Sequence, residues 1–429
     1  MKSIFCIFLM IVGSVLSRVV CFAQQEKLEC TASVERLFQA ANQGDISAQF
    51  RLGYIYENGL SSITQSDIEA AKWYRKAAEQ GEARSQRHLG LMYAYGNGVE
   101  QSDIEAAKWI LRSATQDDPL AQAILGLMHR AGRGVEQSDV EAVKWYSKAA
   151  EHGIDSAQYS LGKFYEYGKG VETSASEAAK WYRKAAEQGH ARAQCALALL
   201  YERGEGVIQS NSEAFKWYHK AAEKGDACAQ LRLGFMYEDG RGVEKSHTKA
   251  FKWYYAAAMQ NYAPAQGILG VMYENGQGVE KSISEAIKWY QRSAENGDSH
   301  GQILLGRMYE NGYGVERSDV DALKWYRNAA EQENEIGQRH VGLMYEYGRG
   351  VEQSNAEAVK WFRKAAEQGD AYGQFYLGAM YEEGRGVKKS IVEASKWYGK
   401  AAEQGVEEAQ EALKKLNTTV VETGAGDEQ

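Results

Sequence analysis

All ten tryptophans of this 429-residue chain recur at one interval of 36 residues, from Trp73 to Trp397. A constant interval of this length indicates a repeat architecture, in which each repeat is one supersecondary element stacked on its neighbours. We therefore expect one continuous array instead of the two or three separate domains that the length alone would suggest.

Each repeat is expected to contain two helices. In residues 190–225, the spacing of Ala193, Leu197, Ala198 and Tyr201 places these side chains on one face of a first helix. Other repeats have glycine in place of Ala198, at a cost of about 1 kcal/mol within a helix, so we expect a neighbouring helix to approach closely there. A Gly-x-Gly-Val segment, present in nine repeats, is expected to end the first helix in a left-handed conformation.

The second helix is expected to begin at a serine in every repeat, from Ser66 to Ser390. Glutamate follows three residues later in eight of the ten repeats, a pattern that predicts a reciprocal capping box. The tryptophan and nearby alanines then form the buried face of this helix. A recurring glutamine of the first helix, such as Gln86, is expected to satisfy backbone groups between repeats.

The ten repeats occupy residues 45–405, with half-repeat helices expected at 24–44 and 406–417. Lys414 and Lys415 replace apolar residues in the second of these helices, as suits a solvent-facing cap. We expect residues 418–429 to be disordered.

Residues 1–23 differ from the rest of the chain. Lys2 precedes an apolar run that is short for a membrane span, and the small-residue pattern before Ala23 predicts cleavage of a signal peptide there. We therefore expect an exported protein, periplasmic or secreted, without stable membrane insertion. The alternatives are an uncleaved anchor and, less favoured, lipid modification of Cys21.

The pattern A-Q-x-x-L-G-x-x-Y-x-x-G-x-G-V, followed by E-A-x-K-W-Y-x-K-A-A-E-Q-G, resembles the Sel1-like repeat, a branch of the tetratricopeptide-repeat superfamily. The resemblance implies an all-α solenoid of ten helical hairpins, 36–37 residues each, wound as a right-handed superhelix with a concave inner surface. It also implies a non-catalytic adaptor for a protein or peptide partner. Many bacterial members are exported and act in signalling, host contact or secretion-system immunity.

Positions that vary between repeats are candidates for partner contacts, because the recurring positions build the fold. Relative to the recurring glutamine these are positions −2, +1, +2, +5 and +9, which by resemblance to tetratricopeptide repeats line the concave groove. Tyrosine and arginine are common in binding hot spots, and they gather near both ends of the array. The alternative is that the variable positions are ordinary surface. The candidate residues are Arg51, Tyr54, Arg84, Arg87, His88 and Tyr95 near one end, and Arg339, His340, Tyr347, Tyr372, Phe375 and Tyr376 near the other.

Cysteine is rare after the leader, which excludes a disulfide framework. Cys195 and Cys228 nevertheless occupy groove positions in adjacent repeats, and they could form one disulfide in an oxidising compartment. Some relatives carry a disulfide in each repeat, but this sequence lacks those cysteine pairs.

No catalytic, cofactor or metal residues are predicted. Residues 297–301 match a nucleophile elbow by letter, but they lie between two expected helices; Ser246 and Lys249 lack the accompanying motifs of penicillin-acting enzymes. The eight histidines have no metal-ligand spacing. A net charge of −8 without a basic patch argues against a nucleic-acid partner. The competing hypothesis is a cell-wall or carbohydrate-associated protein, or an enzyme acting on the cell envelope. The oligomeric state is left open.

Overall fold

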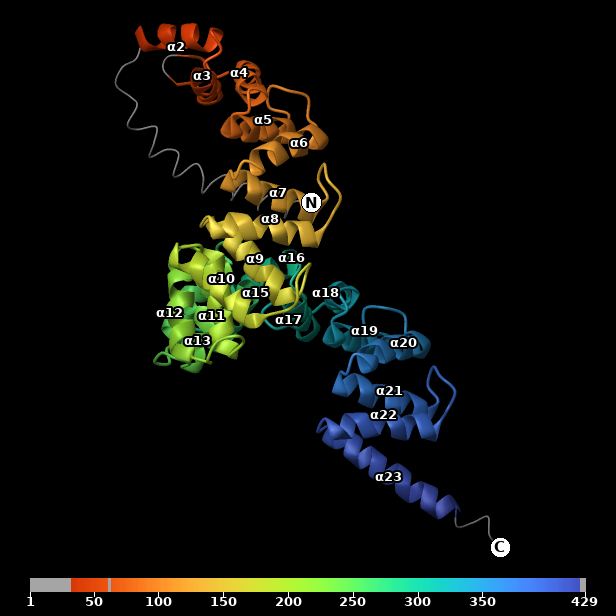
Figure 1. Cartoon of the computed structure of the whole chain (residues 1–429). Helices are drawn as coiled ribbons and strands as arrows, with labels where there is room; N and C mark the ends of the chain where they lie inside the picture. Colours follow the sequence, from red (N-terminus) through yellow and green to blue (C-terminus); the bar gives the residue numbers. More distant parts are fainter. Residues whose placement is uncertain (1–31, 61–62, 425–429) are drawn as a thin grey trace. The chain divides into compact units, whose positions relative to one another are not determined.

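The computed structural model describes residues 32–60 and 63–424, and this part of the chain contains α-helices without strands (Figure 1). Ten helical hairpins follow one another, which confirms the all-α solenoid. The first helices of the hairpins are α3 (Ile46–Asn58), α5 (Ala83–Tyr95), α7 (Pro119–Ala131), α9 (Asp155–Tyr167), α11 (Ala191–Arg203), α13 (Ala227–Asp239), α15 (Ala263–Asn275), α17 (Ser299–Asn311), α19 (Glu335–Tyr347) and α21 (Ala371–Glu383). The second helices are α4 (Asp67–Glu79), α6 (Asp103–Ala114), α8 (Asp139–Glu151), α10 (Ala175–Glu187), α12 (Asn211–Glu223), α14 (His247–Ala258), α16 (Ile283–Glu295), α18 (Asp319–Glu331), α20 (Asn355–Glu367) and α22 (Ile391–Glu403).

A single helix adjoins the array at each end, α2 (Ala32–Asn42) and α23 (Glu407–Gly424). The predicted signal peptide lies outside the described residues. Helix α23 continues past residue 417, where the sequence analysis ends it, because residues 407–423 contain neither glycine nor proline to stop a helix. No helix in the described part of the chain combines the length and apolar character needed to cross a membrane.

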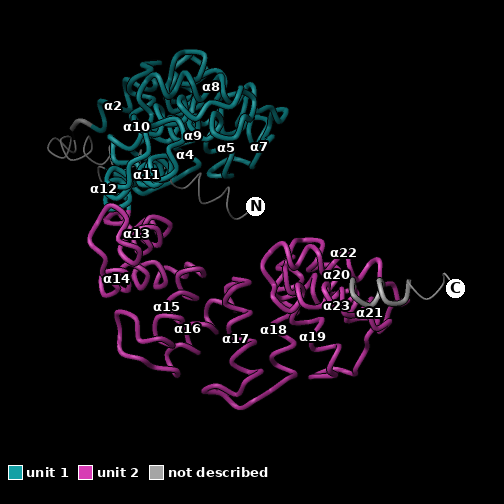
Figure 2. Tube along the Cα trace, turned by 90° about the horizontal axis from the view of Figure 1, so that it is seen from below, with its two compact units in different colours: residues 1–221 teal, residues 222–429 magenta. Residues whose placement is uncertain are grey.

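The chain divides into two compact units, an N-terminal unit that ends at Ala221 and a C-terminal unit that begins at Ala222 (Figure 2). Within each unit, second helices pack between the first helix of their own repeat and that of the next, as α4 does between α3 and α5. First helices of successive repeats also contact each other, as α3 does α5 and α15 does α17. Each unit therefore has a closely packed layer of first helices that is covered by the second helices.

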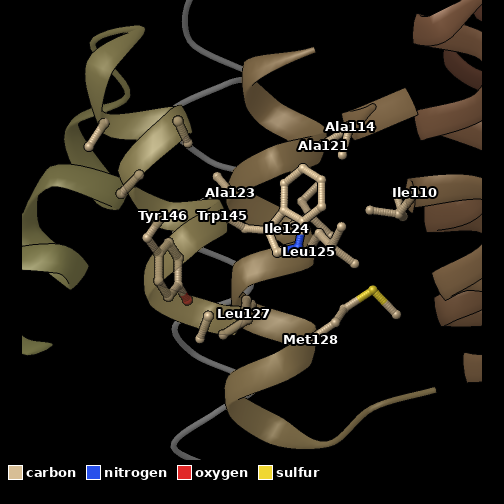
Figure 3. Close-up of a cluster of buried hydrophobic side chains, with 14 of the residues drawn as sticks. Ile110, Ala114, Ala121, Ala123, Ile124, Leu125, Leu127, Met128, Trp145 and Tyr146 are labelled. Atoms are coloured by element: carbon tan, nitrogen blue, oxygen red, sulfur yellow. The ribbon is translucent and has the colours of Figure 1, made fainter. Parts of the chain in front are cut away.

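The recurring tryptophan lies between repeats. Trp109 belongs to the buried cluster around Ala70 and Tyr74 of the preceding repeat, and Trp73 packs in the same way towards α2. Figure 3 shows one buried cluster, in which α7 contributes Ile124 and Leu125 beside Trp145 of the next helix. Since one repeat cannot bury this face alone, the hydrophobic core runs along each unit.

The recurring glycine of the first helix lies against the residue that follows the tryptophan. A Cβ atom built on Gly234 would lie 2.3 Å from Cε1 of Tyr254, and nine repeats have this glycine. The expected close approach is thus confirmed, and the approaching group is an aromatic ring in most repeats.

The recurring glutamines form a buried ladder, which confirms their expected role. In each repeat the glutamine Nε2 donates to an alanine carbonyl eight residues earlier, as Gln86 does to Ala78 over 3.0 Å. Its Oε1 commonly accepts from a side chain at the end of the second helix of its own repeat, as Gln86 does from Gln116 at 2.8 Å. The ladder satisfies polar groups that the packing of one repeat on another would otherwise bury unpaired.

The serine caps are present in all ten repeats, for example with the Glu105 N–H donating to Ser102 Oγ over 3.3 Å. The predicted reciprocal half of the capping box is wrong. The Ser102 N–H donates instead to the Tyr93 carbonyl of the preceding helix over 2.9 Å. Glu105 is consequently available to Lys108, whose Nζ lies 2.7 Å away, and seven other repeats have the same exposed pair.

Candidate protein-binding surface

Four of the five variable positions form one stripe along each first helix. Positions −2, +2, +5 and +9 are spaced i, i+4, i+7 and i+11, which keeps them on one helical face. We call this face the inner stripe; on α5 it consists of Arg84, His88, Leu91 and Tyr95. Position −2 is exposed or half-buried in every repeat, and position +9 is exposed in all repeats except that of Ala131.

Position +1, by contrast, is buried or half-buried in every repeat. Arg87 Nε lies 3.2 Å from Asp118 Oδ2, and the two side chains are only 11% and 9% exposed. Arg339 repeats this arrangement with Asp370, with 2.6 Å between Nη1 and Oδ2. Each of these two predicted contact residues is therefore paired with a carboxylate of the next repeat.

His88 and His340 also occupy equivalent environments, seven repeats apart. His88 stacks on Tyr74 with 4.8 Å between the ring centroids, and His340 stacks on Tyr326 at 4.4 Å. Burial lowers the pKa of His340 to about 4, and the charge of Arg339 acts in the same direction. His340 is therefore neutral near pH 7.

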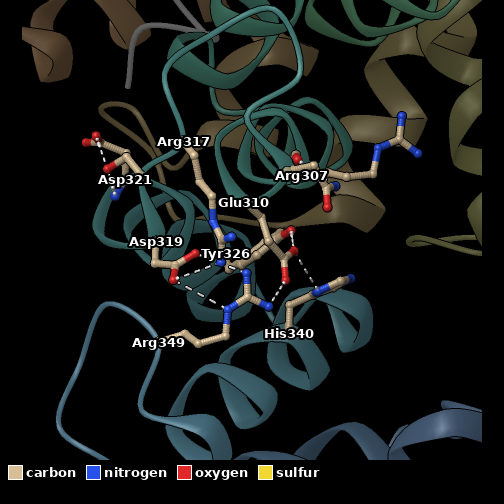
Figure 4. A network of polar contacts seen from close by, with 10 residues as sticks. Arg307, Glu310, Arg317, Asp319, Asp321, Tyr326, His340 and Arg349 are labelled. Carbon is tan, nitrogen blue, oxygen red and sulfur yellow. Dashed lines mark hydrogen bonds and ion pairs between the residues drawn. The ribbon is translucent and has the colours of Figure 1, made fainter.

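A network of ion pairs adjoins His340 (Figure 4). Glu310 accepts a hydrogen bond from Tyr326 Oη at 2.6 Å and another from Arg349 Nη1 at 2.7 Å. Arg349 also pairs with Asp319 of the neighbouring helix at 3.0 Å. The network joins two successive repeats and so helps to position the inner stripe. Its charged groups are paired with one another and are not free to contact a partner.

At the N-terminal candidate patch, Arg51 and Arg84 are exposed, and Tyr54 is half-buried. The Arg84 guanidinium lies over the Phe50 ring, 4.2 Å from its centroid. Tyr95 is 37% exposed, and burial raises its pKa to about 12.

At the C-terminal candidate patch, Tyr347 and Tyr372 are the exposed rings, at 62% and 45%. Phe375 and Tyr376 are half-buried, with their centroids 5.4 Å apart. Tyr376 also stacks on Phe362 at 5.3 Å, so it contributes to the core as well as to the surface.

Position +8, which the sequence analysis did not consider, pairs with the residue after the tryptophan. It is glutamate in eight repeats, and in seven of these it accepts a hydrogen bond from a tyrosine, as Glu238 does from Tyr254 at 2.7 Å. The other two repeats have Ala94 and Arg130 at this position. Comparison of repeats at position +8 would have revealed both departures.

Cys195 is half-buried on α11, and Cys228 is exposed on α13. The two residues belong to different compact units. Their pairing as a disulfide stays a prediction.

The Sel1 repeat family model matches ten consecutive segments, at residues 46–82, 83–118, 119–154, 155–190, 191–226, 229–262, 263–298, 299–334, 336–370 and 371–406. Among solved structures, the chain is similar to a protective antigen with an SLR fold from uropathogenic Escherichia coli strains. The identity is 34%, the match covers 90% of each chain, and the TM-score is 0.62. It is also similar to a Sel1 repeat protein from Oxalobacter formigenes, at 32% identity over 74% of this chain and 92% of the other, with a TM-score of 0.59.

Among curated proteins, the chain is 36% identical over 58 residues to the ERAD-associated E3 ubiquitin-protein ligase component HRD3A of Arabidopsis thaliana. This segment is 14% of the present chain, and the chain spans only 9% of the plant protein. The matched segments run almost without interruption through the array, and two bacterial structures share its architecture. The chain therefore belongs to the Sel1 repeat family.

Proposed function

We propose that the chain is a non-catalytic scaffold that binds a protein or peptide partner along the inner stripe of its first helices. The observation that carries the proposal is the contrast between positions. Trp, Gln, Ser and Gly recur and are used in packing, whereas the inner stripe changes from repeat to repeat and remains accessible at its two end positions, −2 and +9. Exposed tyrosine and arginine on such a surface combine large contact area with directed hydrogen bonds.

We extend the proposal to an exported protein, periplasmic or secreted. The support is the signal-peptide pattern of residues 1–23, together with similarity to an Escherichia coli protein described as a protective antigen. That description favours host contact over signalling or secretion-system immunity as the setting.

A second candidate is a protein that binds cell-wall glycan. The exposed rings of Tyr347 and Tyr372 favour it, because aromatic faces pack on apolar sugar faces as well as on protein. The same residues therefore serve to test both candidates.

The test is capture from a cell-envelope extract by the full chain and by two variants. Tyr347→Ser with Tyr372→Ser alters the inner stripe, whereas Val320→Ser with Val392→Ser alters side chains that are 65% and 77% exposed on second helices. We expect the first variant to lose specific proteins that the second retains. Retention of purified peptidoglycan alone would favour the glycan candidate, and equal protein capture by both variants would exclude the C-terminal patch.

A further inference from the structure

The second helix of the sixth repeat, α14 in the C-terminal unit, differs from the other nine second helices in its surface chemistry (Figure 2). The nine others have Glu or Asp at the third helical position, whereas α14 has Lys249 there. Eight of the nine also have Glu at the position that Met259 occupies. No Asp or Glu occurs between Glu244 and Glu274, so α14 has no carboxylate of its own.

The exposed face of α14 combines lysine with large apolar side chains. Lys252, Tyr255 and Met259 are spaced i, i+3 and i+7, which places them on one face of the helix. Tyr255 and Met259 are 40% and 57% exposed. Arginine occupies the Tyr255 position in four other repeats and donates there to a tyrosine hydroxyl, as Arg327 does to Tyr345. No other repeat has an apolar residue at both the Tyr255 and the Met259 positions.

Two ring contacts hold Tyr255 in place. Its centroid lies 5.9 Å from that of Trp289 on α16, edge to face, and 6.0 Å from that of Phe251 on its own helix. Trp289 is buried in the core, so it cannot move away. The tyrosine ring is therefore preorganised, because it has little side-chain freedom left to lose when a partner covers it. Met259, four residues later, adds an unbranched side chain that adapts to the shape of a partner.

The lysines of α14 lack the partners that other second helices provide. In eight repeats the lysine before the tryptophan pairs with the glutamate three residues earlier, as Lys288 does with Glu285 over 2.6 Å. Lys252 has Lys249 at that distance instead, and the Lys249 Nζ lies over the Tyr237 ring, 5.4 Å from its centroid. In the described part of the chain, neither Nζ has a carboxylate oxygen within 4.0 Å. The face thus carries uncompensated positive charge beside its apolar side chains.

We propose that this face of α14 binds a segment of a partner protein in which Leu, Ile or Met side chains are flanked by Asp or Glu. The apolar side chains would cover Tyr255 and Met259, and the carboxylates would pair with Lys249 and Lys252. An exposed apolar patch beside polar residues is typical of an interaction site. The face lies on a second helix and is separate from the inner stripe of the first helices, so the inference goes beyond the proposed function.

Two other occupants fit this face less well. An isologous contact with a second copy would bring the lysines of both chains onto one patch, which their repulsion opposes. An anionic lipid surface takes up the apolar face of an amphipathic helix, but Ala250, Tyr254 and Ala257 of α14 are already buried in the core. Charge and burial therefore favour a separate protein with acidic residues.

The repeats themselves supply the variants for the test. Tyr255→Arg with Met259→Glu, the double variant, gives α14 the pair found in four other repeats, and Lys249→Glu restores the usual glutamate. The matched control is Leu111→Arg with Thr115→Glu, which makes the same change on α6, where Leu111 is 44% exposed and the carboxylates are retained. Each introduced residue type is present at the equivalent position of other repeats, so folding should be retained.

A phage-displayed library of random 12-residue peptides is panned on the full chain after depletion on the double variant, and the affinities of the enriched peptides are measured by fluorescence anisotropy. We expect peptides in which Leu, Ile or Met lies close to Asp or Glu. Affinity should fall about tenfold or more in the double variant and about threefold or more in Lys249→Glu, and stay within about twofold in the control.

Enriched peptides without acidic residues, or equal affinities for the full chain and the double variant, would overturn the inference. Failure to enrich any peptide after depletion would do the same. If the peptides respond only to the change of Tyr347 and Tyr372, they bind the inner stripe; the proposed function then stands and this inference fails.

The other two occupants are tested by analytical ultracentrifugation and by co-sedimentation with phosphatidylglycerol vesicles. We expect the full chain and the double variant to behave alike in both measurements. Self-association or vesicle binding that the double variant abolishes would assign the face to a second copy or to a lipid surface, and would overturn the inference.

Discussion

Glu346 shows how closely neighbouring repeats depend on single side chains. Its side chain is buried and pairs with Arg385, but Oε2 has no hydrogen-bond partner in the described structure. In seven other repeats a tyrosine hydroxyl donates a hydrogen bond to the equivalent glutamate, whereas here the residue after the tryptophan is Phe362. A buried carboxylate oxygen without a donor destabilises the folded state, because it has lost its hydration without compensation.

Phe362→Tyr should therefore stabilise the protein. The new hydroxyl would donate to Glu346 as Tyr326 does to Glu310, and we expect the free energy of unfolding to rise by about 1 kcal/mol. The measurement is urea denaturation followed by circular dichroism. Tyr326→Phe, which removes the same bond in the preceding repeat, should have the opposite effect; a decrease in both variants would contradict this account.

His340 should make stability depend on pH. Its pKa is about 4 when folded, against a usual value near 6.5, so the unfolded chain binds the proton more readily. The stabilising contribution is complete above pH 6.5 and is lost as the pH falls through 4, by about 3 kcal/mol.

The measurement compares the melting temperature of the chain with that of His340→Phe between pH 7.5 and 4.5. Phenylalanine keeps a ring on Tyr326 but does not titrate. We expect the variant to lose less stability on acidification than the parent chain. Parallel curves for the two proteins would show that His340 does not contribute to the pH dependence.

At the scale of the helix, glycine serves two different purposes, depending on its position. The joint glycines end the first helix in a left-handed conformation, as Gly96 does with φ 75°. The glycine within the first helix instead admits the ring of the following helix. In one repeat Ala198 takes the place of this glycine and is fully buried, so a methyl group is accommodated there.

Two glycines of the last repeat provide a matched comparison. A Cβ on Gly378 would lie 2.7 Å from Tyr398 Cδ1, whereas a Cβ on Gly399 of α22 meets nothing within 4 Å. Gly399→Ala should raise the free energy of unfolding by up to about 1 kcal/mol through helix propensity. Gly378→Ala should lower it by about 1–3 kcal/mol through overpacking. Thermal denaturation of both variants tests this, and equal shifts would rule out the steric explanation.

At the scale of the whole molecule, each repeat is stabilised chiefly by its immediate neighbours. The last repeat depends on α23. Ala409 and Leu416 of this helix, together with Val406 just before it, pack in one buried cluster with Ala394 and Tyr398. In such an array, loss of one interface is felt most by the repeat that formed it.

Removal of residues 406–429 should therefore destabilise the C-terminal end selectively. We expect faster amide hydrogen exchange in α21 and α22, and unchanged exchange in α3 to α6. Hydrogen exchange with mass spectrometry measures both regions in one experiment. Equal acceleration throughout the chain would show that unfolding is cooperative over the whole array.

The sequence by itself determined the repeat, the two helices of each hairpin and the residues that end them, because these depend on interactions within about 36 residues that recur ten times. It also indicated which first-helix positions vary. Which of those side chains remain accessible was decided only by the tertiary structure. Arg87 and Arg339 are paired with Asp118 and Asp370, in each case 31 residues away, and that pairing exists only because successive helices pack side by side.

The capping box and the tyrosine–glutamate pair also depend on how neighbouring helices pack. The Ser102 N–H could have bonded to Glu105, but the folding of the hairpin brings the Tyr93 carbonyl closer. The exchange of a tyrosine–glutamate pair for Ile110 and Ala94 is visible in the sequence as two unrelated differences. Packing of α5, α6 and α7 places Ala94 and Ile110 together among apolar side chains of all three helices. Local patterns thus specify the scaffold, whereas the surface available to a partner depends on which distant side chains the packing brings into contact.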